Sequence, residues 1–288
     1  MTIAHEQQRT LRNGPDISYA GTVTSGPVFA SLKQARRIWA VAAIHGDAER
    51  LRKLHGILGQ RLQSGDRLVY LGNYLGVGPD ILGVIDELLA FRRELLCAPG
   101  AEADDIVFLR GAQEEMWRKL LELQFATAPA DVLDWMMGQG ADATLAAYGG
   151  VATEGRAVCR QGPLATTRWT GRLRAAMHAC PGHDELMTNL RRAALTSGGE
   201  LLFVHAGVDP HRPLTEQGDA FWWGNGYFDE MDEPYCGFRR VISGYDRKRR
   251  PAHANKTIAA IDGGCGFGGQ LNSACFDLTG AAVDWISV

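Results

Sequence analysis

Long apolar runs are absent from this sequence of 288 residues, and its first residues lack a basic start followed by an apolar stretch. A membrane-spanning helix needs about 20 consecutive apolar residues, and a secretory leader has a basic start before its apolar core. We therefore expect a soluble protein of the cytoplasm with no membrane partner. Hydrophobic residues make up 45% of the chain, which is enough for one large buried core.

Closely spaced cysteines and a strong excess of one charge are also missing. Scattered cysteines favour reduced thiols over a disulfide framework or a zinc site. The net charge of -3 and the pI near 6.2 argue against a general nucleic-acid binder. The oligomeric state does not follow from any of these features. The six cysteines are Cys97, Cys159, Cys180, Cys236, Cys265 and Cys275.

Apolar segments in the first half of the chain alternate between strand and helix patterns. Residues 38–44 form a continuous apolar run that ends at a turn and is followed by leucines and isoleucine at helical spacing. The same strand, turn and helix order recurs from residues 67–71 and from residues 106–109. Such alternation predicts a largely parallel, buried sheet whose ligands gather in the loops at the carboxyl ends of the strands.

The second half of the chain predicts another sheet. Short apolar segments separated by glycine-rich turns indicate strands at residues 201–204, 239–242, 257–261, 270–277 and 281–288. Residues 129–198 instead contain helical patterns, including one at 186–195. Residues 1–35 mix Gly, Pro, Ser and Thr with little periodicity, which indicates an N-terminal arm.

Six short blocks follow one another along the chain in a recognisable order. Residues 42–47 read Ala-Ala-Ile-His-Gly-Asp, 72–79 read Gly-Asn-Tyr-Leu-Gly-Val-Gly-Pro, and 110–114 read Arg-Gly-Ala-Gln-Glu. Later come Val-His-Ala-Gly at 204–207, Gly-Tyr-Asp at 244–246, and Asp-Gly-Gly-Cys-Gly-Phe-Gly-Gly at 262–269. Several of these blocks follow the predicted strands directly.

These blocks resemble the motifs of the calcineurin-like metallophosphoesterases, in particular the bacterial serine/threonine protein phosphatase and diadenosine tetraphosphatase branch. The resemblance spans roughly residue 37 to the C-terminus. It implies an α/β fold, an αββα sandwich of two facing mixed sheets flanked by helices, in one domain of residues 36–288. Within that domain, a helical cap at about 129–198 is expected to roof the cleft.

The family's metal ligands are mostly replaced in this chain. Carried over by position, the first ion of the family's dinuclear site would lie at Ala43, His45 and Asn73, and the second at Asn73, Ala112, His205 and Tyr245. We call these six positions the vestigial metal centre. Only the two histidines are ordinary ligands, and Asn73 lacks the negative charge that bridges two dications. A dinuclear metal is therefore expected to be absent, with weak single-ion binding at the two histidines left open.

The groups that would act on a phosphate are replaced as well. Gln113 stands where the family has the histidine that protonates the leaving group, Gly76 where it has the residue that orients this histidine, and Val77 where it has a phosphate-clamping arginine. Two features remain compatible with anion binding. They are Arg110, and the basic cluster Arg247, Lys248, Arg249 and Arg250, for which a solvated loop is the favoured interpretation.

The resemblance and the replaced residues together predict a pseudophosphatase, with no catalytic residues. Such a protein would bind a phosphorylated or acidic partner or regulate other proteins, and the sequence names no particular one. One alternative is a divalent-metal-dependent phosphoesterase with a rebuilt, mononuclear site that uses an acid such as Asp47, Asp246 or Glu114. Another is a nucleic-acid binder that acts through the basic loop, whose binding would weaken steeply with salt.

Overall fold

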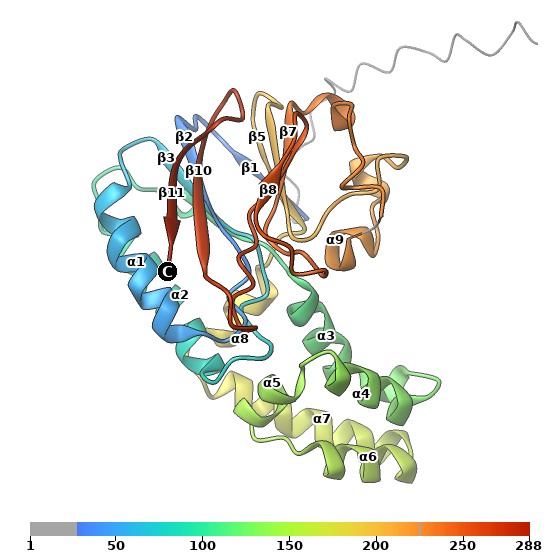
Figure 1. Ribbon diagram of the computed structural model, residues 1–288. Helices are drawn as coiled ribbons and strands as arrows, with labels where there is room; N and C mark the ends of the chain where they lie inside the picture. The colour runs from blue at the N-terminus through green and yellow to red at the C-terminus, as the bar shows by residue number, and fades with distance from the viewer. Residues whose placement is uncertain (1–27, 225) are drawn as a thin grey trace, which may run out of the picture.

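The computed structural model describes residues 28–224 and 226–288, and two β-sheets that face each other form its centre (Figure 1). Helices lie on the outer sides of this sandwich, and a group of helices extends beyond one end of it. The expected α/β architecture of two mixed sheets flanked by helices is confirmed. Among the described residues, no helix is both long enough and apolar enough to cross a bilayer.

The first sheet has five strands in the order β11-β10-β2-β3-β4. The three strands predicted in the first half of the chain pair in parallel at its centre and one edge, and the last two strands of the chain add to it in antiparallel fashion. The strands are β2 (Arg37–Val41), β3 (Asp66–Tyr70), β4 (Ile106–Phe108), β10 (Asn272–Asp277) and β11 (Ala282–Ser287).

The second sheet has six strands in the order β1-β5-β6-β7-β9-β8. Its central strands β6, β7 and β9 pair in parallel, as do β1 and β5. The strands are β1 (Phe29–Leu32), β5 (Ala193–Thr196), β6 (Leu201–Val204), β7 (Arg240–Ser243), β8 (His253–Ala254) and β9 (Ile258–Ala260).

Two sequence expectations differ from this sheet. Residues 29–32 belong to β1 and not to an arm, because they pair with residues 193–196 of β5. The helical pattern expected at 186–195 ends at Thr188, and residues 193–196 form a fully buried strand between β1 and β6. The expected arm therefore overlaps the sandwich, and the expected cap ends before residue 193; the rest of the arm, residues 1–27, lies outside the described residues.

Helices α1 (Ala48–Arg61) and α2 (Ile81–Leu96) cover the outer face of the five-stranded sheet. Each begins after an aspartate, Asp47 or Asp80, whose carboxylate accepts a backbone N–H of the first turn. This capping satisfies donors that a helix cannot satisfy itself. The capped helix starts follow the loops that leave β2 and β3, so the caps help to fix those loops.

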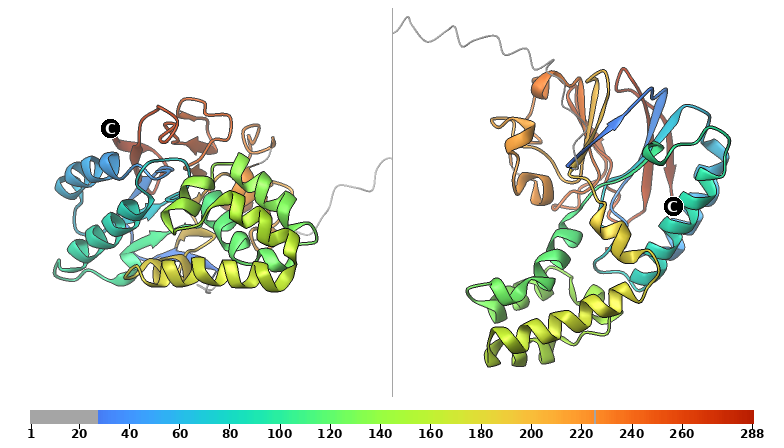
Figure 2. Two further views of the ribbon diagram at one scale, coloured as in Figure 1. Left: turned by 90° about the horizontal axis from the view of Figure 1, so that it is seen from below. Right: turned by 180° about the vertical axis from the view of Figure 1, so that it is seen from behind.

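Six of the remaining helices form the cap, which lies beyond the carboxyl ends of the central strands (Figure 2). Trp117, Tyr148, Trp169 and Leu173 are buried in it. Its helices are α3 (Ala112–Leu121), α4 (Pro129–Gly138), α5 (Asp142–Ala147), α6 (Ala152–Gln161), α7 (Pro163–His178) and α8 (His183–Thr188). A short helix, α9 (Ala220–Trp223), lies beside the six-stranded sheet, and four 3₁₀ turns lie at Ala103–Asp105, Leu123–Phe125, Leu214–Glu216 and Tyr235–Gly237.

Replacing Leu54 by alanine tests the packing of α1 on the sheet. Leu54 has no exposed surface, so Leu54→Ala should lower the free energy of unfolding by about 2–5 kcal/mol through lost burial and a residual cavity. The matched control is Leu164→Ala in α7, because Leu164 is 67% exposed and its truncation should cost less than about 0.5 kcal/mol. Urea unfolding measures both, and equal losses would contradict the assigned packing.

Candidate functional site

The loops that leave β2, β3, β4, β6 and β7 meet at one end of the sandwich. The amide N–H of His45 donates to the Asn73 carbonyl at 2.7 Å, and that of Ala43 donates to the Gly244 carbonyl at 2.9 Å. The amide N–H groups of Gly244 and Tyr245 both donate to the His205 carbonyl. The structure therefore brings together the motif loops that the sequence separates by up to 200 residues.

The loop backbones follow unusual conformations at two of these positions. His45 has a φ of 53° and Asn73 has a φ of 56°, which lie in the left-handed region that few side chains adopt. Both residues are buried in the tight turns where β2 and β3 end. Strained backbone of this kind is held in place by its surroundings, and here the surroundings include a buried carboxylate.

Glu114, at the start of α3, fastens the β3 loop to the β4 loop. Its two carboxylate oxygens accept four backbone N–H groups, from Asn73, Tyr74, Leu75 and Gly111, at 2.8–3.0 Å. Burial raises the pKa of this carboxyl, and the hydrogen bonds from the backbone oppose that rise. Glu114 is therefore fully engaged in holding the loops, with two donors at each oxygen.

Asn73 has a defined amide orientation. Its Oδ1 accepts the backbone N–H of Gln113 at 2.9 Å, so its Nδ2 faces Nε2 of His45 at 3.3 Å and can donate to it. The orientation of the amide follows from these two contacts. The oxygen that could approach a metal is thus already occupied, and the atom directed at His45 is a donor.

Both histidines of the vestigial metal centre are buried and neutral. Burial lowers the pKa of His45 to about 3, with the charges of His205 and Arg249 adding to the effect. Burial lowers the pKa of His205 to about 4, while its hydrogen bond to the Leu71 carbonyl opposes the change. A cation so poorly solvated is disfavoured, so both imidazoles are uncharged at neutral pH.

Three buried polar atoms around this centre have no hydrogen-bond partner among the described residues: His45 Nδ1, His205 Nε2 and Gln113 Oε1. In His205 the other nitrogen, Nδ1, lies 2.7 Å from the Leu71 carbonyl and must donate to it, which leaves Nε2 as an acceptor. Buried polar atoms of this kind are commonly satisfied by water.

Aromatic rings take up much of the space around the histidines. Tyr245 stacks on His205 with ring centroids 5.0 Å apart and planes 7° apart, and it also lies 5.8 Å from the ring of His45. Phe267 meets the His45 ring edge-on at 5.1 Å and carries the Arg249 guanidinium on its face at 3.8 Å. Tyr245 thus packs against a histidine where the family has a metal ligand.

The donor set of this centre does not fit a pair of divalent metal ions. Ala43 and Ala112 are buried and have no ligand atom, and the Asn73 oxygen is already hydrogen-bonded. No group of three or more His, Cys, Asp or Glu side chains that could hold a metal occurs in the described residues. Two neutral imidazoles without any carboxylate cannot balance the charge of two dications.

The acids that a rebuilt mononuclear site would need are engaged elsewhere. Asp47 caps α1 and pairs with Arg50 at 3.2 Å, and Glu114 holds the two loops. Asp246 accepts from the Arg250 side chain at 2.6 Å and from the Lys248 backbone at 2.8 Å. Each carboxylate would have to leave these partners before it could bind a metal.

The cap is fastened to the centre by the replaced residues. Gln113 Nε2 donates to the Gln139 carbonyl at 2.9 Å, and the Gly76 N–H donates to Thr144 Oγ1 at 3.1 Å. A side chain at Gly76 would come within 2.9 Å of His45 Nδ1, so the glycine provides room for this packing. Val77 lies against Gly140, where a Cβ would meet its methyl group at 2.7 Å. The residues at the vestigial acid and phosphate-clamp positions therefore contact the cap.

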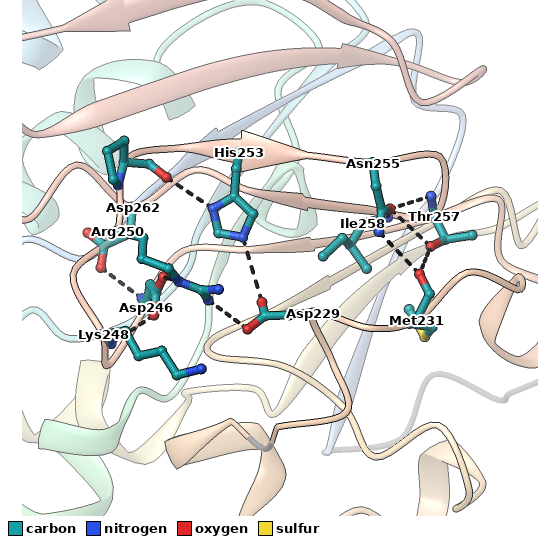
Figure 3. A network of polar contacts seen from close by, with 11 residues as sticks. Asp229, Met231, Asp246, Lys248, Arg250, His253, Asn255, Thr257, Ile258 and Asp262 are labelled. Atoms are coloured by element: carbon teal, nitrogen blue, oxygen red, sulfur yellow. Dashed lines mark hydrogen bonds and ion pairs between the residues drawn. The ribbon is translucent and has the colours of Figure 1, made fainter.

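The predicted anion-binding residues have different surroundings. Arg110 pairs with Glu115 at 3.3 Å and not with the neighbouring Glu114. Arg250 is held by Asp229 and Asp246, and Arg249 covers Phe267. The basic cluster is therefore partly structural, and Figure 3 shows Arg250 between Asp229 and Asp246. The side chains of Arg247 and Lys248 are exposed and have no hydrogen bond, ion pair or ring contact to any described residue.

A cavity of about 220 Å³, which sequence reasoning missed, borders the vestigial metal centre. The cavity is lined by Trp223 of α9, by the loop after α9, and by the loop after β7, which carries Tyr245. Its walls come from segments far apart in the sequence, and the only signals in the sequence were the basic run and the aromatic segment that begins at Phe221.

Solved structures of other proteins share the fold of this chain. A candidate diadenosine tetraphosphatase superposes with a TM-score of 0.54 at 18% identity, covering 91% of this chain and 97% of that one. A cold-active protein tyrosine phosphatase superposes with a TM-score of 0.51 at 12% identity, covering 91% of this chain and 80% of that one. No protein-family model matches the sequence, and no curated protein does.

At these identities the likeness establishes the fold alone. The chain has the fold of the calcineurin-like metallophosphoesterases, which confirms the architecture that the motif resemblance implied. The roles given to individual site residues stay predictions.

Glu114→Gln tests the fastening of the two loops. A glutamine can accept with one oxygen only, and its NH₂ would face two backbone donors, so the free energy of unfolding should fall by about 2–4 kcal/mol. The control is Glu122→Gln, because Glu122 is exposed and pairs only with Arg118 on the surface. A loss for Glu114→Gln no greater than for the control would show that the clamp contributes nothing.

The buried neutral histidines predict a pH dependence of stability. In the unfolded chain they take up a proton near pH 6.5, whereas in the folded protein the pKa values of His45 and His205 are about 3 and 4. The unfolded state therefore binds more protons between pH 6.5 and 4, and stability falls as pH falls through this window. The substitution His205→Gln removes one such histidine. It should reduce the slope of the free energy of unfolding against pH by about 1 kcal/mol per pH unit.

Urea unfolding at pH 7, 6 and 5 measures this slope. His178→Gln is the control, since the His178 side chain is 82% exposed. An unchanged slope in His205→Gln would mean that His205 is not held neutral in the folded protein.

Proposed function

We propose that this protein is a catalytically inactive relative of the metallophosphoesterases that binds a phosphorylated or acidic partner. One observation carries the proposal: the vestigial metal centre is buried and neutral, and no carboxylate of the described residues contacts its two histidines. The folds of the two phosphatases named above support the ancestry, and the replaced residues support the loss of hydrolysis.

Charge balance supports the loss of the metal pair. In two-metal phosphoester hydrolysis the ions activate a water and stabilise the charge on phosphorus, and they must be held by anionic oxygen ligands. Here the Asn73 oxygen accepts from Gln113, and within residues 28–224 and 226–288 no acid contacts His45 or His205. Moving two dications from water into a site of neutral groups costs free energy when no anionic ligand balances their charge.

The loss of an acid at Gln113 supports the same conclusion independently. An amide cannot transfer a proton to a leaving group, and the Gln113 Nε2 donates to the Gln139 carbonyl. Gly76 and Val77 pack against the cap and cannot orient an acid or clamp a phosphate. Restoring metal alone would therefore leave the chemistry incomplete.

Binding is the function that the remaining features support. Arg247 and Lys248 leave two unpaired cations at a cavity, and phosphate or carboxylate groups are their natural ligands. The same pairing of cations with phosphate or carboxylate groups would serve if the bound partner is a protein that this chain regulates. Nucleic-acid binding through the basic loop has weaker support, since Arg250 is held by two carboxylates and the net charge is -3.

Metal loading and turnover test this proposal together. After incubation with manganese and removal of free ion, we expect less than one bound equivalent per chain by elemental analysis. Hydrolysis of p-nitrophenyl phosphate and of a phosphoserine peptide should not exceed the rate of the metal solution alone. His205→Ala is the matched variant and should leave both readings unchanged. Two bound equivalents, with turnover that His205→Ala abolishes, would contradict the proposal.

A further inference from the structure

Three aromatic side chains, Trp223, Phe228 and Tyr245, line the cavity beside the vestigial metal centre, and we call them the aromatic wall. The small residues Ala206 and Ala260 line it as well. The indole of Trp223 is steadied by Trp135 of the cap, whose ring meets it edge-on at 5.6 Å. Aromatic faces in such a wall favour flat, apolar ligand groups.

The two carboxylates at the cavity, those of Asp229 and Asp246, are both paired with one arginine. Arg250 donates through Nε to Asp246 at 2.6 Å and through Nη2 to Asp229 at 2.7 Å (Figure 3). Asp246 also accepts the Lys248 backbone N–H, and its own N–H donates to Asp262. A cationic ligand would therefore find these acids already paired, which disfavours a site for amines.

The unpaired charges at the cavity are positive. Arg247 and Lys248 line it and are exposed, and neither side chain is hydrogen-bonded or ion-paired within the described part of the chain. The aromatic wall and the two cations therefore border the same space.

We propose that this cavity binds an aryl phosphate, with the ring against the aromatic wall and the phosphate against Arg247 and Lys248. The inference rests on the proposed function, since it names the class of its phosphorylated ligand. Pockets for drug-sized molecules usually measure about 300–1,000 Å³. A cavity of about 220 Å³ suits a single ring and its phosphate better than a dinucleotide.

Calorimetric titration with phenyl phosphate, in buffer with a chelator, tests the proposal. Phenyl phosphate should bind at least about tenfold more tightly than inorganic phosphate or phenol, because only it uses both the wall and the cations. Its affinity should also fall as salt is raised. Equal affinity for inorganic phosphate, no binding of phenyl phosphate, or tighter binding of adenosine monophosphate would overturn it.

The double variant Arg247→Gln with Lys248→Gln should weaken phenyl phosphate binding by about tenfold or more and remove most of the salt dependence. Both residues are exposed and unpaired, so the fold should be unaffected. The matched control is Arg160→Gln with Arg168→Gln, which removes two exposed cations from the cap and should leave affinity unchanged. Equal affinities in the two double variants would overturn the assignment.

Two further readings separate this inference from the proposed function and identify the source of the ligand. Phosphorus NMR of the phenyl phosphate sample after manganese addition shows whether inorganic phosphate is released. Protein-dependent release would contradict the proposed loss of hydrolysis, whereas unbound and intact phenyl phosphate would contradict only the cavity assignment. Binding of a phosphotyrosine peptide but not a phosphoserine peptide supports a protein source, and binding of phenyl phosphate alone supports a small molecule.

Discussion

The buried carboxylate of Glu114 is the interaction on which the arrangement of the site depends. It gathers four backbone N–H groups from the loops after β3 and β4, and so fixes the turn that carries Asn73 and the helix start that carries Gln113. An anion satisfied in this way acts as a structural pin. The loops of the vestigial metal centre are therefore held in place by hydrogen bonds of the protein itself.

Neutrality is the second constraint on the vestigial metal centre. Carboxylates buried close together would repel one another and lose solvation, whereas alanine, asparagine and a stacked tyrosine do not. Burial keeps the imidazoles of His45 and His205 neutral, and Tyr245 packs flat on His205. Unpaired charge is found instead on the neighbouring loop, at Arg247 and Lys248, where solvent reaches it.

Sequence reasoning succeeded where a pattern is local. Continuous apolar runs of strand length, such as residues 38–44, predicted the central strands. Strand β5 is four residues long, and no local pattern encodes its pairing with β1 and β6. The loops that carry the motifs lie together in the structure, and the roles of their residues stay predictions. The motifs did not reveal that Arg110 pairs with Glu115, nor the cavity, because both depend on the packing of segments distant in the chain.

Anomalous X-ray diffraction from crystals soaked in manganese tests the central claim most directly. Manganese scatters anomalously, so the measurement locates any ordered ion without reference to activity. The account predicts no ordered pair of manganese peaks between His45, Asn73 and His205, with at most a weak single peak at an imidazole. Two strong peaks a few ångströms apart, on either side of the Asn73 side chain, would contradict it.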